Sequence, residues 1–431
     1  MAITGTLGRT LGAGAVACLV LLGPATGVVG AQVSAVARAP SMAAPAADRS
    51  VPTPGIASFL LGAACASSRN CWAVGGFYPT RQRGLNQALR WNGRRWSLVP
   101  TPTPGAGSTL IGAACASSGN CWAVGSYLTS QGGGLNQALH WNGRRWSLVS
   151  TPHPGTSASF SGLASIRCTS AIDCWAVGNY EPNSSSGPGF NLVLHWNGRR
   201  WSLVPTPQPG GTASTASSEL EGIRCTSSGS CWAVGSYSAP GSQNTDLNQV
   251  LHWNGRRWSL VPTPQPGGTA SGDFSMLSHV SCASPSGCWA VGAYGTRTGN
   301  QRTELNQALH WNGRRWSLAS LPEPDGIGTG AINHLNDVFC TSPADCWAVG
   351  RFGSNRTGGV SLNQALHWNG RLWSLVPTPD PGGTAIGDSN ELYSIRCTSS
   401  ANCWAVGNVL PNGQNGRNQV LHWNGIRWST G

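Results

Sequence analysis

The stretch that decides the fold is Cys231-Trp232-Ala233-Val234-Gly235, followed by His252-Trp253-Asn254-Gly255-Arg256-Arg257-Trp258-Ser259. This pair of motifs occurs, with small variations, seven times between residue 50 and Gly431. A fixed internal period outweighs chain length as a guide to domain count, so the 431 residues predict one large repeat domain.

Each copy predicts four short strands. In the fourth copy, Leu220 to Cys225 alternates apolar and polar residues and predicts the first strand, and Cys231 to Tyr237 predicts the second. Leu247 to Trp253 and Arg257 to Val261 predict the third and fourth strands.

The third and fourth strands are joined through Asn254-Gly255, a pair that favours two-residue hairpin turns because both residues tolerate positive φ. Such a turn would pair Trp253 with Arg256 and Leu251 with Trp258. We therefore expect guanidinium and indole groups to stack on one face of the hairpin.

Cysteines occur in pairs with five residues between partners. Setting Cys18 aside, the sequence predicts seven disulfides, each pinning the hairpin of its first two strands, because an even count at one repeated spacing is typical of exported chains. Zinc is the competing interpretation, but each copy lacks a second ligand pair at zinc spacing. The predicted pairs are Cys65 with Cys71, Cys115 with Cys121, Cys168 with Cys174, Cys225 with Cys231, Cys282 with Cys288, Cys340 with Cys346 and Cys397 with Cys403.

The copies recur at the interval of four-stranded propeller blades. Successive first cysteines are 50, 53, 57, 57, 58 and 57 residues apart. We therefore predict an all-β, seven-bladed β-propeller of four antiparallel strands per blade over residues 51–431. The expected blades are at about 56–100, 106–150, 160–205, 218–262, 274–319, 331–377 and 388–430.

A proline-rich segment, Pro262 to Gly268 in the fourth copy, follows each fourth strand and cannot continue a ladder. We expect it to lead from the outer edge of one blade to the innermost strand of the next. The last copy lacks this segment, and Ser50 to Gly55 supplies the missing piece, so the chain ends should meet between blades seven and one.

The first residues predict export. Residues 1–31 have the pattern of a secretory signal, with Arg9, an apolar core and a cleavage site after residue 31 or 37. Cys18 lies inside the core, whereas a lipoprotein cysteine would lie at its end. Residues 32–50 predict a flexible leader. We expect a secreted, extracellular protein with no transmembrane segment after cleavage.

The motifs resemble those of a group of exported, repeat-built bacterial proteins, common in actinobacteria, that are described as kelch-like or sialidase-like propellers. The resemblance is carried by Cys-x5-Cys-Trp-Ala-Val-Gly with His-Trp-Asn-Gly-x-x-Trp-Ser and Val-Pro-Thr-Pro, over about residues 50 to 431. It implies a seven-bladed propeller and no established activity. Because no sialidase catalytic set is recognised, no enzymatic role follows from it.

Two sets of residues are candidates for ligand binding. All 27 basic residues are Arg, against 15 acids, and this balance favours anionic partners. The Arg that follow the Asn-Gly turns should gather on one face of the ring, where they either bind an anionic polymer or are merely solvated. The second Arg of each pair is Arg95, Arg145, Arg200, Arg257 or Arg315.

Acids and histidines just before or within the innermost strands are the second set, on the face where the loops vary. They either form an acid and base site or cap the crossovers. We single out Asp273, Asp337 and Asp388 as ligand-binding candidates; the wider set is Glu219, Glu221, Asp273, His279, His334, Asp337, Asp388 and Glu391.

Other repeated residues have scaffold interpretations as well as functional ones. The 21 Trp are three per copy and favour blade packing over sugar stacking. The repeated His is replaced by Arg90 in the first copy, which favours a cross-strand structural role. The Leu-Asn-Gln run, as at Leu247 to Gln249, either binds sugar hydroxyls or caps the ladder.

We expect a non-enzymatic binding protein for carbohydrate or an anionic extracellular polymer, without cofactor, metal or catalytic residues, and with protein as another possible partner. The alternative is an extracellular glycoside hydrolase or lyase at the propeller axis, using acids such as Asp337 and Asp388.

Overall fold

The computed structural model describes residues 51–81, 83–155, 159–182, 187–238, 241, 245–298, 301–354 and 359–431. The predicted signal and leader, residues 1–50, lie outside these ranges. The described residues contain no helix that is long and apolar enough to cross a membrane.

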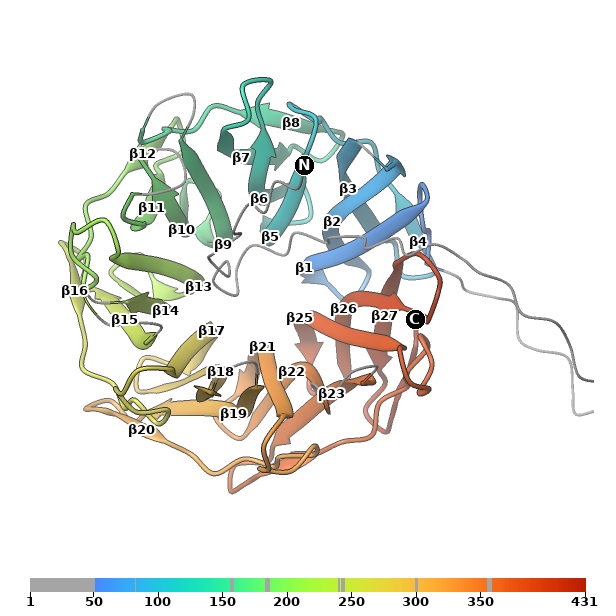
Figure 1. Ribbon diagram of the computed structural model, residues 1–431. Helices are drawn as coiled ribbons and strands as arrows, with labels where there is room; N and C mark the ends of the chain where they lie inside the picture. The colour runs from blue at the N-terminus through green and yellow to red at the C-terminus, as the bar shows by residue number, and fades with distance from the viewer. Residues whose placement is uncertain are drawn as a thin grey trace, which may run out of the picture. The chain divides into compact units, whose positions relative to one another are not determined.

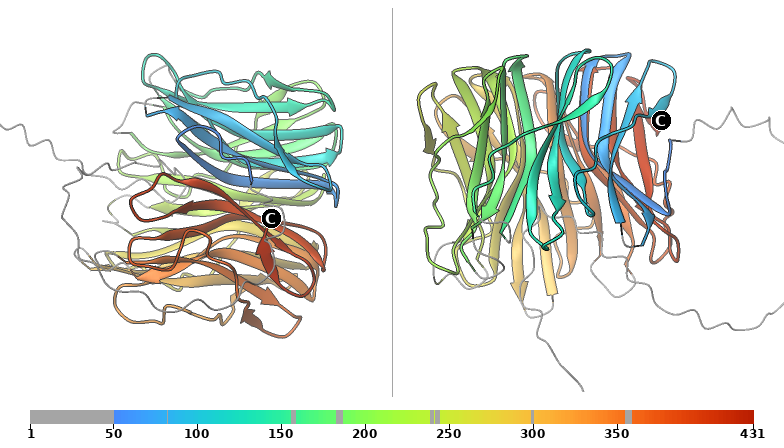
Figure 2. Two further views of the ribbon diagram at one scale, coloured as in Figure 1. Left: turned by 90° about the vertical axis from the view of Figure 1, so that its right-hand side faces the viewer. Right: turned by 90° about the horizontal axis from the view of Figure 1, so that it is seen from above.

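The described residues form 28 strands in seven four-stranded antiparallel blades, arranged in a ring as the sequence predicts (Figure 1). In side view the strands run roughly along the ring axis (Figure 2). The first strand of every blade is innermost. These inner strands are β1 (Ala57–Ser67), β5 (Thr109–Ser117), β9 (Phe160–Ser170), β13 (Ser217–Ser227), β17 (Asp273–Ser284), β21 (Ala331–Ser342) and β25 (Ser389–Ser399).

The other three strands of each blade follow in chain order toward the rim. The second strands are β2 (Asn70–Thr80), β6 (Asn120–Leu128), β10 (Asp173–Glu181), β14 (Ser230–Ser238), β18 (Gly287–Thr298), β22 (Asp345–Ser354) and β26 (Asn402–Leu410). The third strands are β3 (Arg83–Trp91), β7 (Gly134–Trp141), β11 (Phe190–Trp196), β15 (Leu247–Trp253), β19 (Gln301–Trp311), β23 (Ser361–Trp368) and β27 (Arg417–Trp423). The fourth strands are β4 (Trp96–Leu98), β8 (Trp146–Val149), β12 (Trp201–Leu203), β16 (Trp258–Leu260), β20 (Trp316–Leu318), β24 (Trp373–Leu375) and β28 (Trp428–Thr430).

All seven predicted disulfides form, and each joins two cysteines that lie directly opposite each other on the first two strands of a blade. No pairing runs between blades, so the pairs are those that the spacing predicts. In blade order, the bonds join Cys65 to Cys71, Cys115 to Cys121, Cys168 to Cys174, Cys225 to Cys231, Cys282 to Cys288, Cys340 to Cys346 and Cys397 to Cys403.

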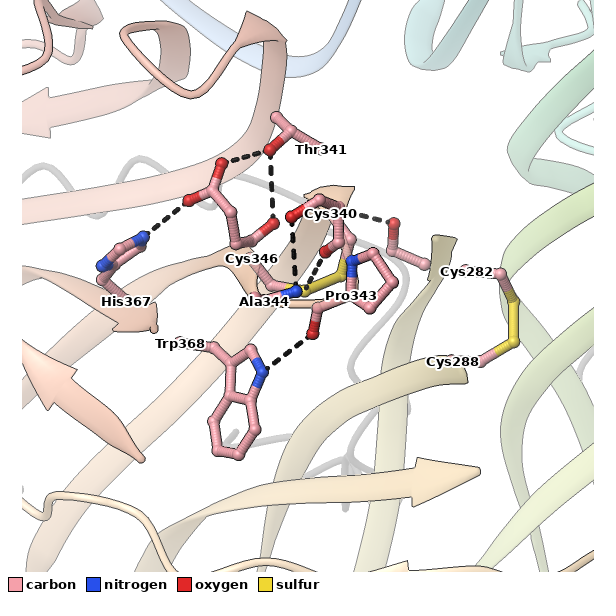
Figure 3. The surroundings of a disulfide bond; sticks show 12 residues. Cys282, Cys288, Cys340, Thr341, Pro343, Ala344, Cys346, His367 and Trp368 are labelled. Atoms are coloured by element: carbon pink, nitrogen blue, oxygen red, sulfur yellow. Dashed lines mark hydrogen bonds and ion pairs between the residues drawn. A yellow bond between two sulfur atoms is a disulfide. The ribbon is translucent and has the colours of Figure 1, made fainter. Parts of the chain in front are cut away.

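The third strand supports the disulfide hairpin. Around the Cys340–Cys346 bridge, the indole Nε1 of Trp368 donates a hydrogen bond to the carbonyl oxygen of Pro343 at 3.1 Å (Figure 3). Pro343 lies in the turn between the two cysteines. The hairpin is therefore held both by its own disulfide and by an indole of the neighbouring strand.

The predicted register of the Asn-Gly hairpin is wrong. Trp253 pairs with Trp258 and Leu251 with Leu260, so the connection has four residues instead of two. The carboxamide oxygen of Asn254 accepts the backbone N–H of Arg256 and of Arg257, both at 3.0 Å, and Gly255 has a φ of +87°. These side-chain hydrogen bonds stabilise the longer turn, because they satisfy backbone donors that a two-residue turn would place in the ladder.

Because the turn is longer, the predicted stacking of guanidinium on indole in this hairpin is also wrong. Both Arg lie in the turn and are exposed. The cation–π contacts found among the described residues involve other arginines, such as Arg90 over Trp72. The turn arginines therefore take no part in packing the blades, and the tryptophans do this instead.

Tryptophans join each blade to the next. Trp232 of the fourth blade lies 4.8 Å from Trp311 and 5.3 Å from Trp316 of the fifth, measured between ring centroids. Trp404 of the last blade makes the same contacts with Trp91 and Trp96 of the first, at 4.7 and 5.4 Å. These contacts give the Trp residues the packing role favoured by the sequence, and they extend it across the closing seam.

Ring closure occurs where the sequence predicts it. The carboxamide of Asn418 in the last blade donates to the carbonyl oxygen of Pro52 at 2.6 Å. In the fourth blade Asn248 makes the equivalent bond to Pro264 at 2.8 Å. Pro52 thus takes the place of the crossover that the last copy lacks.

Candidate functional site

A β-bulge interrupts every inner strand at the same position, four residues before the first cysteine. In the fourth blade Leu220 pairs with Gly235 and Gly222 with Val234, so Glu221 has no ladder partner. The preceding residue is Leu in all seven blades and is buried. Because a bulged residue leaves the ladder, its side chain can be directed to the axis independently of blade packing.

We call the seven unpaired residues the bulge ring. Its members are Leu61, Ile111, Ala164, Glu221, Ser278, Asn336 and Tyr393. The first three blades contribute apolar residues and the last four contribute polar ones. The axis therefore has an apolar side and a polar side, although the blades around it are nearly identical in sequence.

Two carboxyl groups of the fourth blade lie on the polar side. The side chains of Glu219 and Glu221 are partly exposed, but the ring surrounds them with protein. This burial is the main cause of their shifted pKa values. It raises the pKa of Glu219 to about 7, even though the Ser236 hydroxyl donates to its carboxylate at 3.0 Å. Burial and the neighbouring Glu219 raise the pKa of Glu221 well above its ordinary value. These groups can hold a proton near neutral pH.

The seventh blade lies across the axis from the fourth (Figure 1). Its inner strand carries Glu391, a carboxylate paired with an arginine. Glu391 accepts hydrogen bonds from Nε of Arg351 at 3.1 Å, the carboxamide of Asn336 at 3.1 Å and the hydroxyl of Tyr393 at 2.8 Å. Asn336 and Tyr393 belong to the bulge ring. The carboxylate is thus oriented by three donors from two blades.

The fifth and sixth blades share a histidine–carboxylate pair. The Nδ1 atom of His334 bonds to Glu304, and its Nε2 lies 3.3 Å from the hydroxyl oxygen of Ser278. Arg302 lies 2.8 Å from the other oxygen of Glu304. Burial alone would raise the pKa of Glu304, but His334 and Arg302 outweigh it and hold the pKa at about 2.

A second histidine–carboxylate pair lies on the disulfide side of the bulge ring. Nδ1 of His279 is 2.9 Å from Oδ1 of Asp337, in a bent arrangement that makes a poor hydrogen bond, and its Nε2 is 3.5 Å from the hydroxyl of Ser165. Gly222 of the fourth blade lies between Ser165 and His279. It has no side chain, and a Cβ at this position would lie 2.7 Å from the Cα of His279. The glycine therefore lets groups of the third and fifth blades meet.

Asp337 is fully engaged by neighbouring donors. It accepts from Nη1 of Arg396 at 2.6 Å, the hydroxyl of Ser394 at 2.8 Å and the backbone N–H of Ile395 at 2.9 Å. Burial opposes ionisation, but Arg396 and His279 outweigh it and hold the pKa of Asp337 well below its ordinary value. Asp337 is therefore an ionised acceptor that ties the sixth blade to the seventh.

The remaining candidate acids lie at or just before the start of their inner strands, next to the crossovers. Asp273 and Asp388 each accept a backbone N–H of a crossover turn at 2.9 Å, from Ala270 and Ala385 respectively. These bonds give both residues a capping role, and their binding of a ligand remains a prediction. Asp388 and Asp337 are thus in different environments, and Glu219, Glu221 and Glu391 are the stronger acidic set at the axis.

The candidate arginines lie in the exposed turns between third and fourth strands, and not at the start of the fourth strand as the sequence predicts. Arg95, Arg145, Arg200, Arg257 and Arg315 are all exposed, as are the other arginines of these turns. Their binding of an anionic polymer remains a prediction.

The repeated His and Asn residues are part of the scaffold. His252 packs on Trp232, with ring centroids 4.3 Å apart, and Arg90 lies over Trp72 in the first blade instead. Asn248 and Gln249 are buried, and Gln249 bonds to the carboxamide of Asn191 in the preceding blade. Burial excludes the sugar-binding interpretation of the Leu-Asn-Gln run.

A surface hollow of about 390 Å³ lies between the disulfide hairpins of the first and last blades. Its lining includes Ser67, Ser68, Thr398 and Asn402 and contains no titratable side chain, because its two cysteines are in disulfides. The hollow therefore offers polar groups but no acid or base.

Sequence reasoning missed the bulge ring, because a bulge leaves the composition of a strand unchanged. A signal was present nonetheless. The copies share Leu five residues before the first cysteine, and they differ in charge and size at the next position. Such variation directly after a residue that all copies share indicates a residue outside the shared packing.

No protein-family model and no curated sequence matches this chain. Among solved structures, the chain is similar to a polysaccharide lyase, a PL25 ulvan lyase bound to -[GlcA(1-4)Rha3S]-, with 9% identity over 88% of this chain and 97% of that one and a TM-score of 0.50. It also resembles the GH74 xyloglucanase from Xanthomonas campestris, with 12% identity over 88% of this chain and 55% of that one and a TM-score of 0.49. A third is YCF48 bound to D1 peptide, with 14% identity over 85% and 94% of the chains and a TM-score of 0.47. At these identities the comparison shows the β-propeller fold alone.

Proposed function

We propose that the protein is an extracellular glycoside hydrolase or lyase that acts at the axis, around the bulge ring. The observation that carries the proposal is the contrast between carboxyl groups across the axis. Burial raises the pKa of Glu219 and Glu221, whereas Glu391 is held by Arg351 and Tyr393. A carboxyl with a raised pKa can act as a general acid, and a carboxylate oriented by a guanidinium and a hydroxyl can act as a base or nucleophile.

Each residue has a role in this proposal. Glu221, outside the ladder, donates a proton to the leaving glycosidic oxygen. Glu391 acts as the base or nucleophile, oriented by Arg351 and Tyr393. The apolar side of the axis, where Ile111 and Ala164 are partly exposed, contacts the faces of sugar rings.

The proposal includes the compartment. The seven disulfides are typical of an oxidising, extracellular environment, and export through the signal at residues 1–31 is part of the proposal. Membership of the kelch-like or sialidase-like group of actinobacterial type is also part of the proposal.

The test is cleavage of a panel of neutral and acidic polysaccharides, followed by reducing ends for hydrolysis and by ultraviolet absorbance of unsaturated products for elimination. We expect Glu221→Gln and Glu391→Gln each to lower kcat by roughly 10²-fold or more. The control is Glu323→Gln, which removes a carboxyl from a crossover and should leave cleavage unchanged. A wild-type protein that cleaves nothing in the panel, or glutamine variants as active as wild type, would contradict the proposal.

The pH dependence of cleavage follows from the raised pKa values. An acid catalyst must be protonated, and burial raises the pKa of the proposed acid Glu221 well above its ordinary value, so cleavage should persist at a pH where an ordinary carboxyl is ionised and fall only at higher pH. A pH–rate profile of kcat/KM measures this alkaline limb. A rate that already falls as pH rises through about 4.5, the ordinary pKa of a Glu carboxyl, would remove Glu221 from the acid role.

Non-enzymatic binding is the second candidate function. It is favoured by the exposed arginines of the Asn-Gly turns and by the formal charge of +12. Retention of an acidic polysaccharide without cleavage, weakened by salt and by replacing Arg95, Arg145, Arg200, Arg257 and Arg315 with Ser, would support it. Binding that is unaffected by those replacements would count against it.

A further inference from the structure

Three arginines share one level of the axis, next to the disulfides. Arg167, Arg224 and Arg396 each stand immediately before the first cysteine of their inner strand, in β9, β13 and β25. The other four blades have uncharged residues at this position: Ala64, Ala114, Ser281 and Phe339. The cations are therefore an addition to the repeat and not a requirement of the fold.

The contacts of these side chains bring them together. The guanidinium carbon of Arg224 lies 5.5 Å from the ring centroid of Phe339, and that of Arg396 lies 5.8 Å from the same ring. Arg224 belongs to the fourth blade and Phe339 to the sixth, so Arg224 extends past the fifth blade. Only the small Ser281 occupies this level in that blade.

Their electrostatics agree with this geometry. Burial and the charges of Arg167 and Arg396 together lower the pKa of Arg224 to about 9, against a smaller opposite effect of Asp337. Burial and Arg396 lower the pKa of Arg167 to about 10. The three guanidinium groups are thus close enough to repel one another.

The charge at this level is not balanced by protein groups. Asp337 is engaged by Arg396 and contacts His279. Within the described part of the chain, Arg167 makes no hydrogen bond or ion pair, and its Nε is buried. Arg224 makes one hydrogen bond, of 3.4 Å, to the carbonyl oxygen of Cys282, and its Nε is also buried without a partner. Buried cations without a counter-charge reduce the stability of the fold, and water molecules carry no charge that could neutralise them.

We propose that Arg167, Arg224 and Arg396 form a binding site for one oxyanion group, such as sulfate, phosphate or a carboxylate. Guanidinium groups match such anions with two parallel hydrogen bonds, and an anion among them would relieve their repulsion. The group comes either from a free inorganic ion or from the acidic group of a polymer. This site differs in residues and chemistry from the proposed cleavage site, and its test needs no cleavage.

The matched variants come from the chain itself. Arg167→Ala gives the third blade the residue that the first two blades have before their first cysteine. Arg224→Ser gives the fourth blade the residue that the fifth blade has at this position. Because the same fold already accepts Ala and Ser at this position, both variants should fold. Arg69→Ala, in an exposed turn of the first blade, is the control for the loss of one positive charge.

The experiment measures thermal unfolding and calorimetric titration with sodium sulfate and sodium phosphate, at an ionic strength held constant with chloride. We expect saturable binding and stabilisation of the wild type and of Arg69→Ala. Arg167→Ala and Arg224→Ser should weaken the Kd at least about tenfold. Without added oxyanion, both variants should unfold at a higher temperature than the wild type, because repulsion has been removed.

A competition arm identifies the source of the oxyanion. A sulfated or uronate-containing oligosaccharide that displaces sulfate, where its neutral counterpart does not, would support the site and assign it to a polymer. Binding of inorganic sulfate or phosphate alone would support the site and assign it to a free ion. The proposal is overturned if sulfate and phosphate act no differently from chloride on the wild type, or if both arginine variants bind as the wild type does.

Discussion

At the scale of single residues, one crossover position shows how a scaffold contact sets a pH response. Gln208 and Gln265, each between two prolines, accept the backbone N–H of Asn191 and Asn248 at 2.7 and 2.6 Å. Glu323 accepts the same bond from Asn306 at 3.0 Å, and burial raises its pKa to about 7. Because the folded state holds this proton more tightly than the unfolded state does, the carboxyl costs stability once it must ionise.

We predict that Glu323→Gln removes a pH-dependent loss of stability. The stabilising effect of the protonated carboxyl is full below the unfolded pKa of about 4.5 and is lost as pH rises through about 7. The variant should therefore match the wild type at about pH 4 and exceed it at about pH 8 by about 1 kcal/mol, after discounting for partial exposure. Denaturant unfolding at both pH values measures this. Gln265→Glu should show the opposite change, and equal pH dependence of both variants would contradict the argument.

At the scale of the element, the turn between third and fourth strands depends on one carboxamide oxygen. Asn254 accepts two backbone N–H groups, and the same pattern recurs at Asn92, Asn142, Asn197, Asn312, Asn369 and Asn424. The acceptor, and not the amide donor, is what the turn requires.

We predict that Asn254→Ala lowers the free energy of unfolding by about 1 kcal/mol, because two turn donors lose their acceptor. Asn254→Asp keeps an oxygen at this position and should change stability by less than about half as much. Chemical denaturation of the two variants distinguishes them. Equal losses would mean that the amide group, and not the oxygen, maintains the turn.

The extent of what sequence could predict follows from how local each contact is. Cysteine spacing predicts the disulfides, since partners only six positions apart must meet within one hairpin. The turn length could not be predicted from Asn-Gly alone, because the carboxamide of Asn254 selects a four-residue connection. The axis was predicted in part. Glu219, Glu221, His279, His334, Asp337 and Glu391 are candidates from the sequence, but Tyr393, Arg351 and Arg167 are not. Tyr393 depends on a bulge, Arg351 bonds to Glu391 of the next blade, and Arg167 lies near Arg396 of another blade.

At the scale of the whole molecule, the seam between the last and first blades repeats the packing found between the fourth and fifth. Trp404 lies against Trp91 and Trp96 at nearly the distances that separate Trp232 from Trp311 and Trp316. The Asn418 bond to Pro52 adds the same polar tie as Asn248 makes to Pro264. The ring is thus closed by the same contacts that join its other blades.

We predict that Trp404→Ala and Trp232→Ala destabilise the protein equally, each by about 3–5 kcal/mol, because each removes one buried indole from a seam of the same construction. Calorimetric unfolding of the two variants makes the comparison. A much smaller loss for Trp404→Ala would show that the closing seam opens before the others.

The confinement of each disulfide to one hairpin has a consequence for how the chain acquires its bonds. Fourteen cysteines allow on the order of 10⁵ pairings. When a chain emerges with its N-terminus first, Cys71 follows Cys65 by six residues, whereas Cys115 of the next blade follows Cys65 by 50 residues. Each pair is therefore complete long before the thiols of the next blade emerge, and once it is oxidised it leaves no free thiol for them. Oxidative maturation can proceed blade by blade, without a reshuffling step among near-identical modules.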